Sequence, residues 1–229
     1  MQCWICGKDA DSGEHLIKAS DLKMIFGKVR QDKPLYMHTD AQRNIRVAGL
    51  QSNKLKYEKV ICRDCNSSRT QASDKAWELL SRLLQNRTPA IKAGSCVRLA
   101  KFFPGTVNKT MTLVQLFFVK QFGCLISEHN IPLDTASFRE AILNVKPHPE
   151  VYLRFLTGLE DHQIQLLSRS PVNAIEKNGK VCFATWIYMV DRIAVNVVYA
   201  GEDEFKERLR CAFHPLRGTR VIRFQSFDE

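Results

Sequence analysis

Two pairs of cysteines with the same C-x-x-C spacing constrain this 229-residue chain more than any other feature. The pairs are Cys3/Cys6 and Cys62/Cys65, and 55 residues lie between them. Two residues between cysteines allow one tight turn to direct both sulfurs at the same ion. Four thiolates are the ligand set of a closed structural zinc site. We therefore expect these cysteines to hold Zn²⁺ and to join two distant segments of the chain.

The compartment expected for the protein agrees with a metal site rather than with disulfides. Residues 1–11 show no basic stretch followed by an apolar run, so no secretory signal is visible and we expect a cytoplasmic protein. Structural disulfides are rare in a reducing compartment. The longest apolar stretch that we identify, 181–190, is shorter than the roughly 18–20 residues that a spanning helix needs, so we expect no membrane segment.

Positive charge is concentrated in the first part of the chain. The formal net charge is +10, and residues 1–130 hold 21 Lys and Arg against 11 Asp and Glu. Residues 131–229 hold 13 of each. A field of this sign favours a polyanionic partner, and nucleic acid is the commonest one. A charge that serves only solubility is the alternative.

The composition and a turn-forming segment indicate a globular protein in two parts. A hydrophobic content of 45% with 25% charged residues excludes disordered, collagen-like and coiled-coil chains. A break at 86–89 divides the chain into predicted domains 1–88 and 89–229. The sequence has no phosphate-binding P-loop, no serine-hydrolase elbow and no dinucleotide-binding glycine motif, which leaves those enzyme classes without support.

Three polar residues lie beside the cysteine pairs. Glu14 and His15 follow the first pair, and Asn66 directly follows Cys65. Neighbouring side chains on a strand point to opposite faces, although at a strand end or a kink both can reach one pocket. The apolar spacing over 74–85 predicts an amphipathic helix soon after Asn66.

The order C-x-x-C, Glu-His, C-x-x-C-Asn resembles the zinc-containing HNH nucleases of the ββα-metal (treble-clef) class. It is most similar to the layout of phage junction-resolving endonucleases, and the resemblance covers residues 1–85. It implies a zinc-stapled nuclease module that cuts phosphodiester bonds, with DNA as the expected substrate; the sequence does not separate DNA from RNA. Cys3, Cys6, Cys62 and Cys65 would then hold the structural zinc.

The resemblance also implies catalytic roles. His15 would be the general base that deprotonates the attacking water, and Glu14 and Asn66 would hold a catalytic Mg²⁺ or Mn²⁺. An imidazole that titrates near pH 6.5 can accept a proton at neutral pH. Oxygen ligands suit a hard cation that neutralises charge on the phosphate.

The sequence departs from the family pattern after Asn66, because the next histidine is His129. Asp74 is the obvious substitute ligand, but eight helical residues rise about 12 Å, too far to share one ion with Asn66. A loop would bring Asp74 closer, so Asp74 stays a candidate outside the ligand shell. Arg69 is a candidate phosphate contact or a partner of Asp74. The main alternative is a treble-clef module that binds nucleic acid without cutting it.

Residues 89–229 are predicted to form an α+β domain built on an antiparallel sheet. We expect helices at 111–127 and 135–144, and a hairpin turn at Asn178-Gly179. The expected strands are 151–156, 163–167, 180–190, 193–199 and 219–224. No chemistry can be assigned to this domain, whose open roles are ligand or protein binding, homo-oligomerisation and substrate positioning. A weaker alternative gives it the whole function and leaves the zinc module structural.

Overall fold

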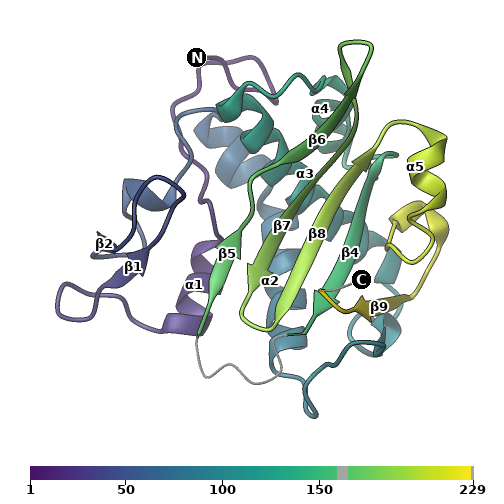
Figure 1. Ribbon diagram of the computed structural model, residues 1–229, viewed down its shortest axis with the longest axis horizontal. Helices are drawn as coiled ribbons and strands as arrows, with labels where there is room; N and C mark the ends of the chain where they lie inside the picture. Colours follow the sequence, from purple (N-terminus) through teal and green to yellow (C-terminus); the bar gives the residue numbers. More distant parts are fainter. Residues whose placement is uncertain (159–164, 228–229) are drawn as a thin grey trace.

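A mixed seven-stranded sheet is the frame of the part of the chain that the computed structural model describes, residues 1–158 and 165–227 (Figure 1). The predicted strand 163–167 begins in the segment outside this part. The strands in spatial order are β3 (Cys96–Arg98), β9 (Val221–Gln225), β4 (Val151–Thr157), β8 (Ile193–Ala200), β7 (Lys180–Val190) and β5 (Leu167–Arg169), and β6 (Asn173–Lys177) also pairs with β7.

One pair of strands departs from the predicted antiparallel sheet. β4 and β9 run parallel, with Phe155 opposite Phe224, whereas every other described pair in this sheet is antiparallel. The connection after β8 includes α5 (Asp203–Glu207) and a 3₁₀ turn at Pro215–Arg217 before β9 begins. This connection carries the chain from β8 past β4 to the other edge of β4, so β9 is parallel to β4 although it is antiparallel to β8. The α+β class is confirmed, and its sheet is mixed.

The hairpin turn at Asn178-Gly179 forms where the sequence predicts it, although the strand before it, β6, was not predicted. Asn178 and Gly179 both have positive φ, 54° and 71°, as a two-residue type I′ turn requires. Along β7 the side chains alternate, and Ala184, Trp186 and Tyr188 are fully buried on the helix side. Trp186 and Tyr188 therefore belong to the core and offer no surface for stacking bases.

Helices cover one face of the sheet (Figure 1): α2 (Gln71–Gln85), α3 (Val107–His129) and α4 (Ala136–Asn144). The ring of Trp77 on α2 stacks on Phe117 of α3 at 5.5 Å and meets Tyr188 edge-on at 5.7 Å. Buried Asp21 of α1 (Ala19–Phe26) accepts hydrogen bonds from the indole of Trp77 and the hydroxyl of Tyr188, which fixes α1 to the same layer.

In length and composition, α3 resembles a membrane-spanning helix, although the uninterrupted apolar runs in the sequence predict none. Its most apolar window has a mean hydropathy of 1.3, but 78% of that window is buried inside the protein. A helix that is apolar all round is also what the centre of a folded core requires. The contacts of Phe117, Phe118 and Phe122 with neighbouring aromatic rings show that α3 has this second role.

Two N-terminal segments pair through isolated β-bridges, and a helix follows the second; we call this pair of segments the hairpin. Residues 12–16 run antiparallel to residues 55–61, with bridges at Ser12–Ile61 and His15–Lys56. The chain then enters a π-helix at Asp64–Arg69 and continues as α2. Residues between the two paired segments form α1 and a small ribbon of β1 (Leu35–Met37) and β2 (Ile45–Val47).

The two predicted domains share one hydrophobic core. A single cluster of buried residues includes Ile5, Trp77 and Leu80 from the first region and Phe118 and Trp186 from the second. Trp4 in the first cysteine loop packs on α3 so closely that a Cβ at Gly123 would lie 2.3 Å from its ring. The division at residue 88 therefore stays a prediction about sequence regions, and we use 1–88 and 89–229 in that sense.

Acid should destabilise this core through His148, which is fully buried. Its Nε2 lies 2.9 Å from Ser137 Oγ, and burial lowers its pKa to about 3. An unfolded histidine titrates near 6.5, so between pH 6.5 and pH 3 the unfolded chain binds the extra proton. Stability should fall as the pH drops through this window, by about 1.4 kcal/mol per pH unit for one such proton.

Urea unfolding of wild type, His148→Gln and His129→Gln between pH 7 and pH 4 measures this effect. His129 is exposed and serves as the matched control. We expect a shallower pH dependence of the unfolding free energy only in His148→Gln. Part of the slope should remain in this variant, because burial also lowers the pKa of His214. Equal slopes for all three proteins would contradict the assignment.

Candidate metal centre and adjoining charged site

The four predicted zinc cysteines meet at one point. Their sulfurs all lie within 4.8 Å of one another, and the Sγ atoms of Cys6 and Cys62 are 3.6 Å apart. Zn–S bonds of about 2.3 Å place tetrahedral sulfurs about 3.8 Å apart, so the observed cluster fits this metal. A cluster of at least three potential metal ligands occurs nowhere else in the described residues.

Local turns build the centre from two segments. Gly7 has φ of 75°, the left-handed conformation that suits glycine, and its N–H donates to Cys3 O at 2.8 Å. On the other side, Asn66 N donates to Cys62 O in the first turn of the π-helix. Burial raises the pKa of the Cys65 thiol, which favours the protonated form. A bound metal cation would oppose this effect and hold the residue as a thiolate.

Close pairing of the two hairpin segments positions Glu14 and His15. A Cβ at Gly13 would lie 2.6 Å from Tyr57 O, which means that only glycine allows this approach. Tyr57 N donates to Glu14 O at 2.8 Å, and Leu16 N donates to Leu55 O at 2.8 Å. The backbone around Glu14 and His15 is therefore held from both sides.

Glu14 points inward to α3 and is only 4% exposed. Its Oε1 accepts a hydrogen bond from Gln121 Nε2 at 2.9 Å and lies 3.2 Å from Lys120 Nζ. Lys120 is fully buried, and its Nζ also lies 2.7 Å from Asp74 Oδ1. Burial opposes the charge on Lys120, but Glu14 and Asp74 raise its pKa above the ordinary lysine value. One ammonium thus joins both carboxylates.

Asp74 and Arg69 lie in different surroundings. The second oxygen of Asp74 pairs with Lys18 Nζ at 3.2 Å, so two cations balance Glu14 and Asp74. We call Glu14, Lys18, Asp74 and Lys120 the charge network. Arg69 pairs with Asp64 at 3.6 Å and not with Asp74. Because residues 64–85 are helical apart from Thr70, the loop that would bring Asp74 toward Asn66 is not formed.

His15 is held in a defined tautomer. Its Nε2 lies 3.0 Å from the carbonyl oxygen of Leu50, and a carbonyl can only accept, so Nε2 carries the proton. Nδ1 is then the atom that can take up a proton. Burial lowers the pKa of His15 below its ordinary value, although the Leu50 carbonyl and Glu14 act in the opposite direction. The imidazole is therefore neutral at neutral pH.

Asn66 reaches back to the hairpin. Its Nδ2 donates to Ser12 Oγ at 2.9 Å and to Gly13 O at 3.5 Å. No described residue donates to its Oδ1, which is the oxygen that could face a cation. Glu14, His15 and Asn66 surround the same hairpin, but within residues 1–158 and 165–227 they make no hydrogen bond with one another.

Sequence reasoning missed Lys120 and Gln121 as neighbours of the site. Both lie on α3, more than 100 positions after Glu14, in a segment that is otherwise apolar. The available signal was Lys120 itself, because a lysine in the middle of a buried helix requires a carboxylate partner. The sequence does not show which carboxylate that is.

The fold and the cysteine centre define an α+β protein with a four-cysteine, zinc-type metal module. No protein-family model, no curated protein and no solved structure matches the chain.

Proposed function

We propose that the protein is a zinc-stapled, HNH-like endonuclease that hydrolyses phosphodiester bonds in DNA. The observation that carries the proposal is the hydrogen bond from His15 to Leu50 O, which leaves Nδ1 of a neutral imidazole free to accept a proton. The hairpin that carries this histidine, the helix that follows it and the four-cysteine centre are the parts that a ββα-metal, treble-clef module requires.

His15 acts as the general base in this proposal. Its Nδ1 takes the proton of the attacking water while the Leu50 carbonyl keeps Nε2 protonated and the ring oriented. Removing such a base typically slows a reaction 10²–10⁴-fold. The cleavage rate should depend on a group with a pKa below 6.5, because burial lowers the pKa of His15.

The residues for a catalytic cation fit in part. Asn66 offers Oδ1, whereas Glu14 Oε1 already accepts from Gln121 and pairs with Lys120. Both contacts described for the Glu14 carboxylate use Oε1, so Oε2 is the candidate ligand atom. Asn66 and Glu14 would hold Mg²⁺ or Mn²⁺, which would neutralise charge on the scissile phosphate.

One observation favours a second candidate function. Lys120 already supplies a positive charge between Glu14 and Asp74. A module whose carboxylates are neutralised in this way can bind nucleic acid without cutting it. This second candidate keeps the zinc centre and the positive charge of residues 1–130 and assigns Glu14 a structural role.

Nicking of supercoiled plasmid distinguishes the two functions. Wild type, His15→Ala and the exposed control His129→Ala are compared at equal zinc content, with added Mg²⁺, added Mn²⁺ or no added divalent cation. The nuclease proposal predicts cation-dependent nicking by wild type and the control, a loss of at least 100-fold in His15→Ala, and an acid limb below pH 6.5. Retained DNA binding with no nicking by any of the three would favour the binding module.

A further inference from the structure

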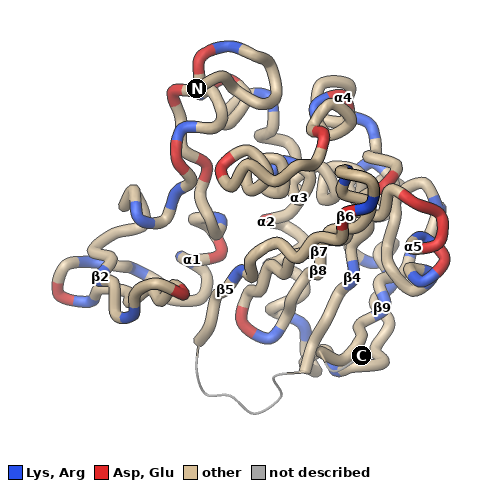
Figure 2. Tube along the Cα trace, turned by 45° about the horizontal axis from the view of Figure 1, so that its top comes forward, with Lys and Arg blue, Asp and Glu red and all other residues tan. Residues whose placement is uncertain are grey.

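The segment 28–56, which we call the basic arm, extends away from the sheet and its helices (Figure 1). It contains β1, β2 and their connecting loops. Seven Lys and Arg residues lie in it against two Asp, and Figure 2 shows Lys and Arg along the tube of this segment. The basic residues are Lys28, Arg30, Lys33, Arg43, Arg46, Lys54 and Lys56.

The ribbon at the centre of the arm has two different faces. Leu35 pairs with Val47 and Met37 with Ile45, and Leu35, Met37 and Val47 pack on the hydrophobic core. The opposite face carries the cross-strand pair of Tyr36 and Arg46, where Tyr36 is 59% exposed. The apolar face attaches the ribbon to the body, so the aromatic and cationic face is directed to solvent.

Most cations of the arm have no carboxylate partner. Arg30 pairs with Asp32 at 3.5 Å, and it is the only arm cation with an ion pair among the described residues. Arg46 Nη2 donates to Gln31 O, and Lys54 Nζ donates to Arg46 O at 3.2 Å, which braces the loops.

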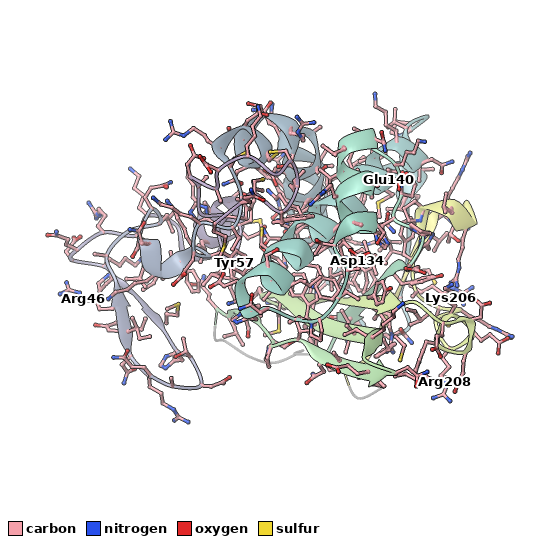
Figure 3. All side chains as sticks on the ribbon, turned by 90° about the horizontal axis from the view of Figure 1, so that it is seen from above. Arg46, Tyr57, Asp134, Glu140, Lys206 and Arg208 are labelled. Atoms are coloured by element: carbon pink, nitrogen blue, oxygen red, sulfur yellow. The ribbon has the colours of Figure 1, made fainter. Side chains whose placement is uncertain are left out.

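The opposite end of the molecule differs in this respect. Figure 3 shows Arg46 at one end and Lys206 and Arg208 at the other. Lys206 pairs with Asp203 at 3.0 Å, and Arg208 lies 3.7 Å from Glu204. Lys206 and Arg208 are thus balanced locally, whereas most cations of the arm have no carboxylate partner among the described residues.

The C-terminal part of the arm contacts His15. Leu50, whose carbonyl holds the imidazole, lies in the arm, and Lys56 is the bridge partner of His15. An anion that lies along the arm can therefore extend to the base of the arm, where His15 is held. Cations spread over a ribbon and two loops suit a linear polyanion better than one small anion.

We propose that the basic arm binds the sugar-phosphate backbone of duplex DNA through the outward face of its ribbon and the adjoining loops. The identity of the polyanion rests on the proposed nuclease function. B-form DNA presents a regular row of phosphates, and its major groove admits a two-stranded ribbon. The cations of the arm position the duplex, and His15 at its base meets the backbone.

The test uses the full-length variant Lys28→Gln/Lys33→Gln/Arg43→Gln. These three side chains are exposed and make no described hydrogen bond or ion pair, so the arm should keep its fold. The matched control is Lys206→Gln/Arg208→Gln/Arg210→Gln, which removes the same charge at the other end, where Lys206 is half-buried and Arg208 and Arg210 are exposed. Binding to a fluorescein-labelled duplex of about 30 base pairs is measured by anisotropy from 50 to 300 mM NaCl without added divalent cation.

We expect the arm variant to bind at least tenfold more weakly at 100 mM salt. Each lost phosphate contact reduces the slope of log K against log salt concentration by about 0.9, so three contacts make it shallower by about 3. The control should stay within twofold of wild type. Equal weakening of both variants, equal binding by the arm variant and wild type, or full displacement of the duplex by polyglutamate at equal charge overturns the proposal.

Plasmid nicking separates this result from the proposed function. If the arm variant binds like wild type while His15→Ala abolishes cutting, the arm proposal fails and the nuclease stands. If the arm variant loses binding while wild type binds but does not cut, the arm proposal stands and the nuclease fails.

Discussion

Replacing Cys62 with serine is expected to remove the metal and unfold the N-terminal module. Cys62 is only 5% exposed, and the cluster to which it belongs connects residues 3–6 with the start of the helical segment at residues 62–65. Binding of structural zinc contributes on the order of 10–16 kcal/mol in zinc-finger peptides, and this free energy is coupled to folding. This contribution is as large as the whole stability of a typical domain, about 5–15 kcal/mol.

The loss should extend beyond the metal site. Trp4, between the first two cysteines, packs on Gly123 of α3, and its carbonyl accepts from Arg139 Nε at 3.2 Å. Once the cysteine loop is released, these contacts with α3 and α4 are lost as well. We therefore expect a lower melting temperature for the shared core and not only local disorder at the N-terminus.

Zinc content by mass spectrometry and thermal unfolding by circular dichroism measure both effects. Cys211→Ser is the matched control, because Cys211 is exposed and lies outside the cluster. It should keep wild-type zinc content and melting. A Cys62→Ser protein with unchanged zinc and an unchanged melting temperature would show that the four cysteines do not share a metal.

Local signals explain which features could be predicted. The equal spacing of two cysteine pairs predicts the cluster, and Asn178-Gly179 predicts the type I′ turn, because each depends on neighbouring residues only. β7 was predicted at the bounds observed, 180–190, since its apolar run ends at turns on both sides. These elements need no knowledge of distant partners.

Features set by distant contacts were missed. The helix predicted from 74 begins at Gln71 after a π-helix, because the second cysteine pair must turn its sulfurs to the metal before the regular helix starts. His148 and His214 lie outside helices and strands, beside Pro147, Pro149 and Pro215, yet both are buried and His214 Nε2 lies 3.0 Å from His148 O. No local pattern reveals such pairing.

The charge network is the clearest case of this kind, and its removal defines the second large effect. In Lys120→Met the carboxylates of Glu14 and Asp74 lose the buried ammonium that joins them. Breaking a buried ion pair from one side typically destabilises a protein by about 3–5 kcal/mol, because a charge stays behind without compensation. We expect a loss of this order at pH 7, with Lys18 retaining part of the balance at Asp74.

The pH dependence of that loss identifies its origin. Without Lys120, the carboxylates of Glu14 and Asp74 lose a cation, and burial of an uncompensated carboxylate favours its protonated form. The folded protein then binds protons more readily, so the deficit of Lys120→Met relative to wild type should shrink as the pH falls from 7 toward 4. A defect of packing alone would keep the same size over this range.

Two further variants make the test decisive. Glu14→Gln/Asp74→Asn/Lys120→Met removes all three charges with similar volumes, and it should recover much of the stability, because replacing a whole buried ion cluster is often nearly neutral. Lys177→Met removes the exposed partner of Glu202 and should leave the urea midpoint unchanged. If Lys120→Met also unfolds at the wild-type midpoint, the network is not what holds Glu14, and the carboxylate would be free to bind a cation. If Lys120→Met is destabilised and the triple variant restored, α3 of the second region fixes a carboxylate of the candidate site, and residues 1–88 cannot form that site alone.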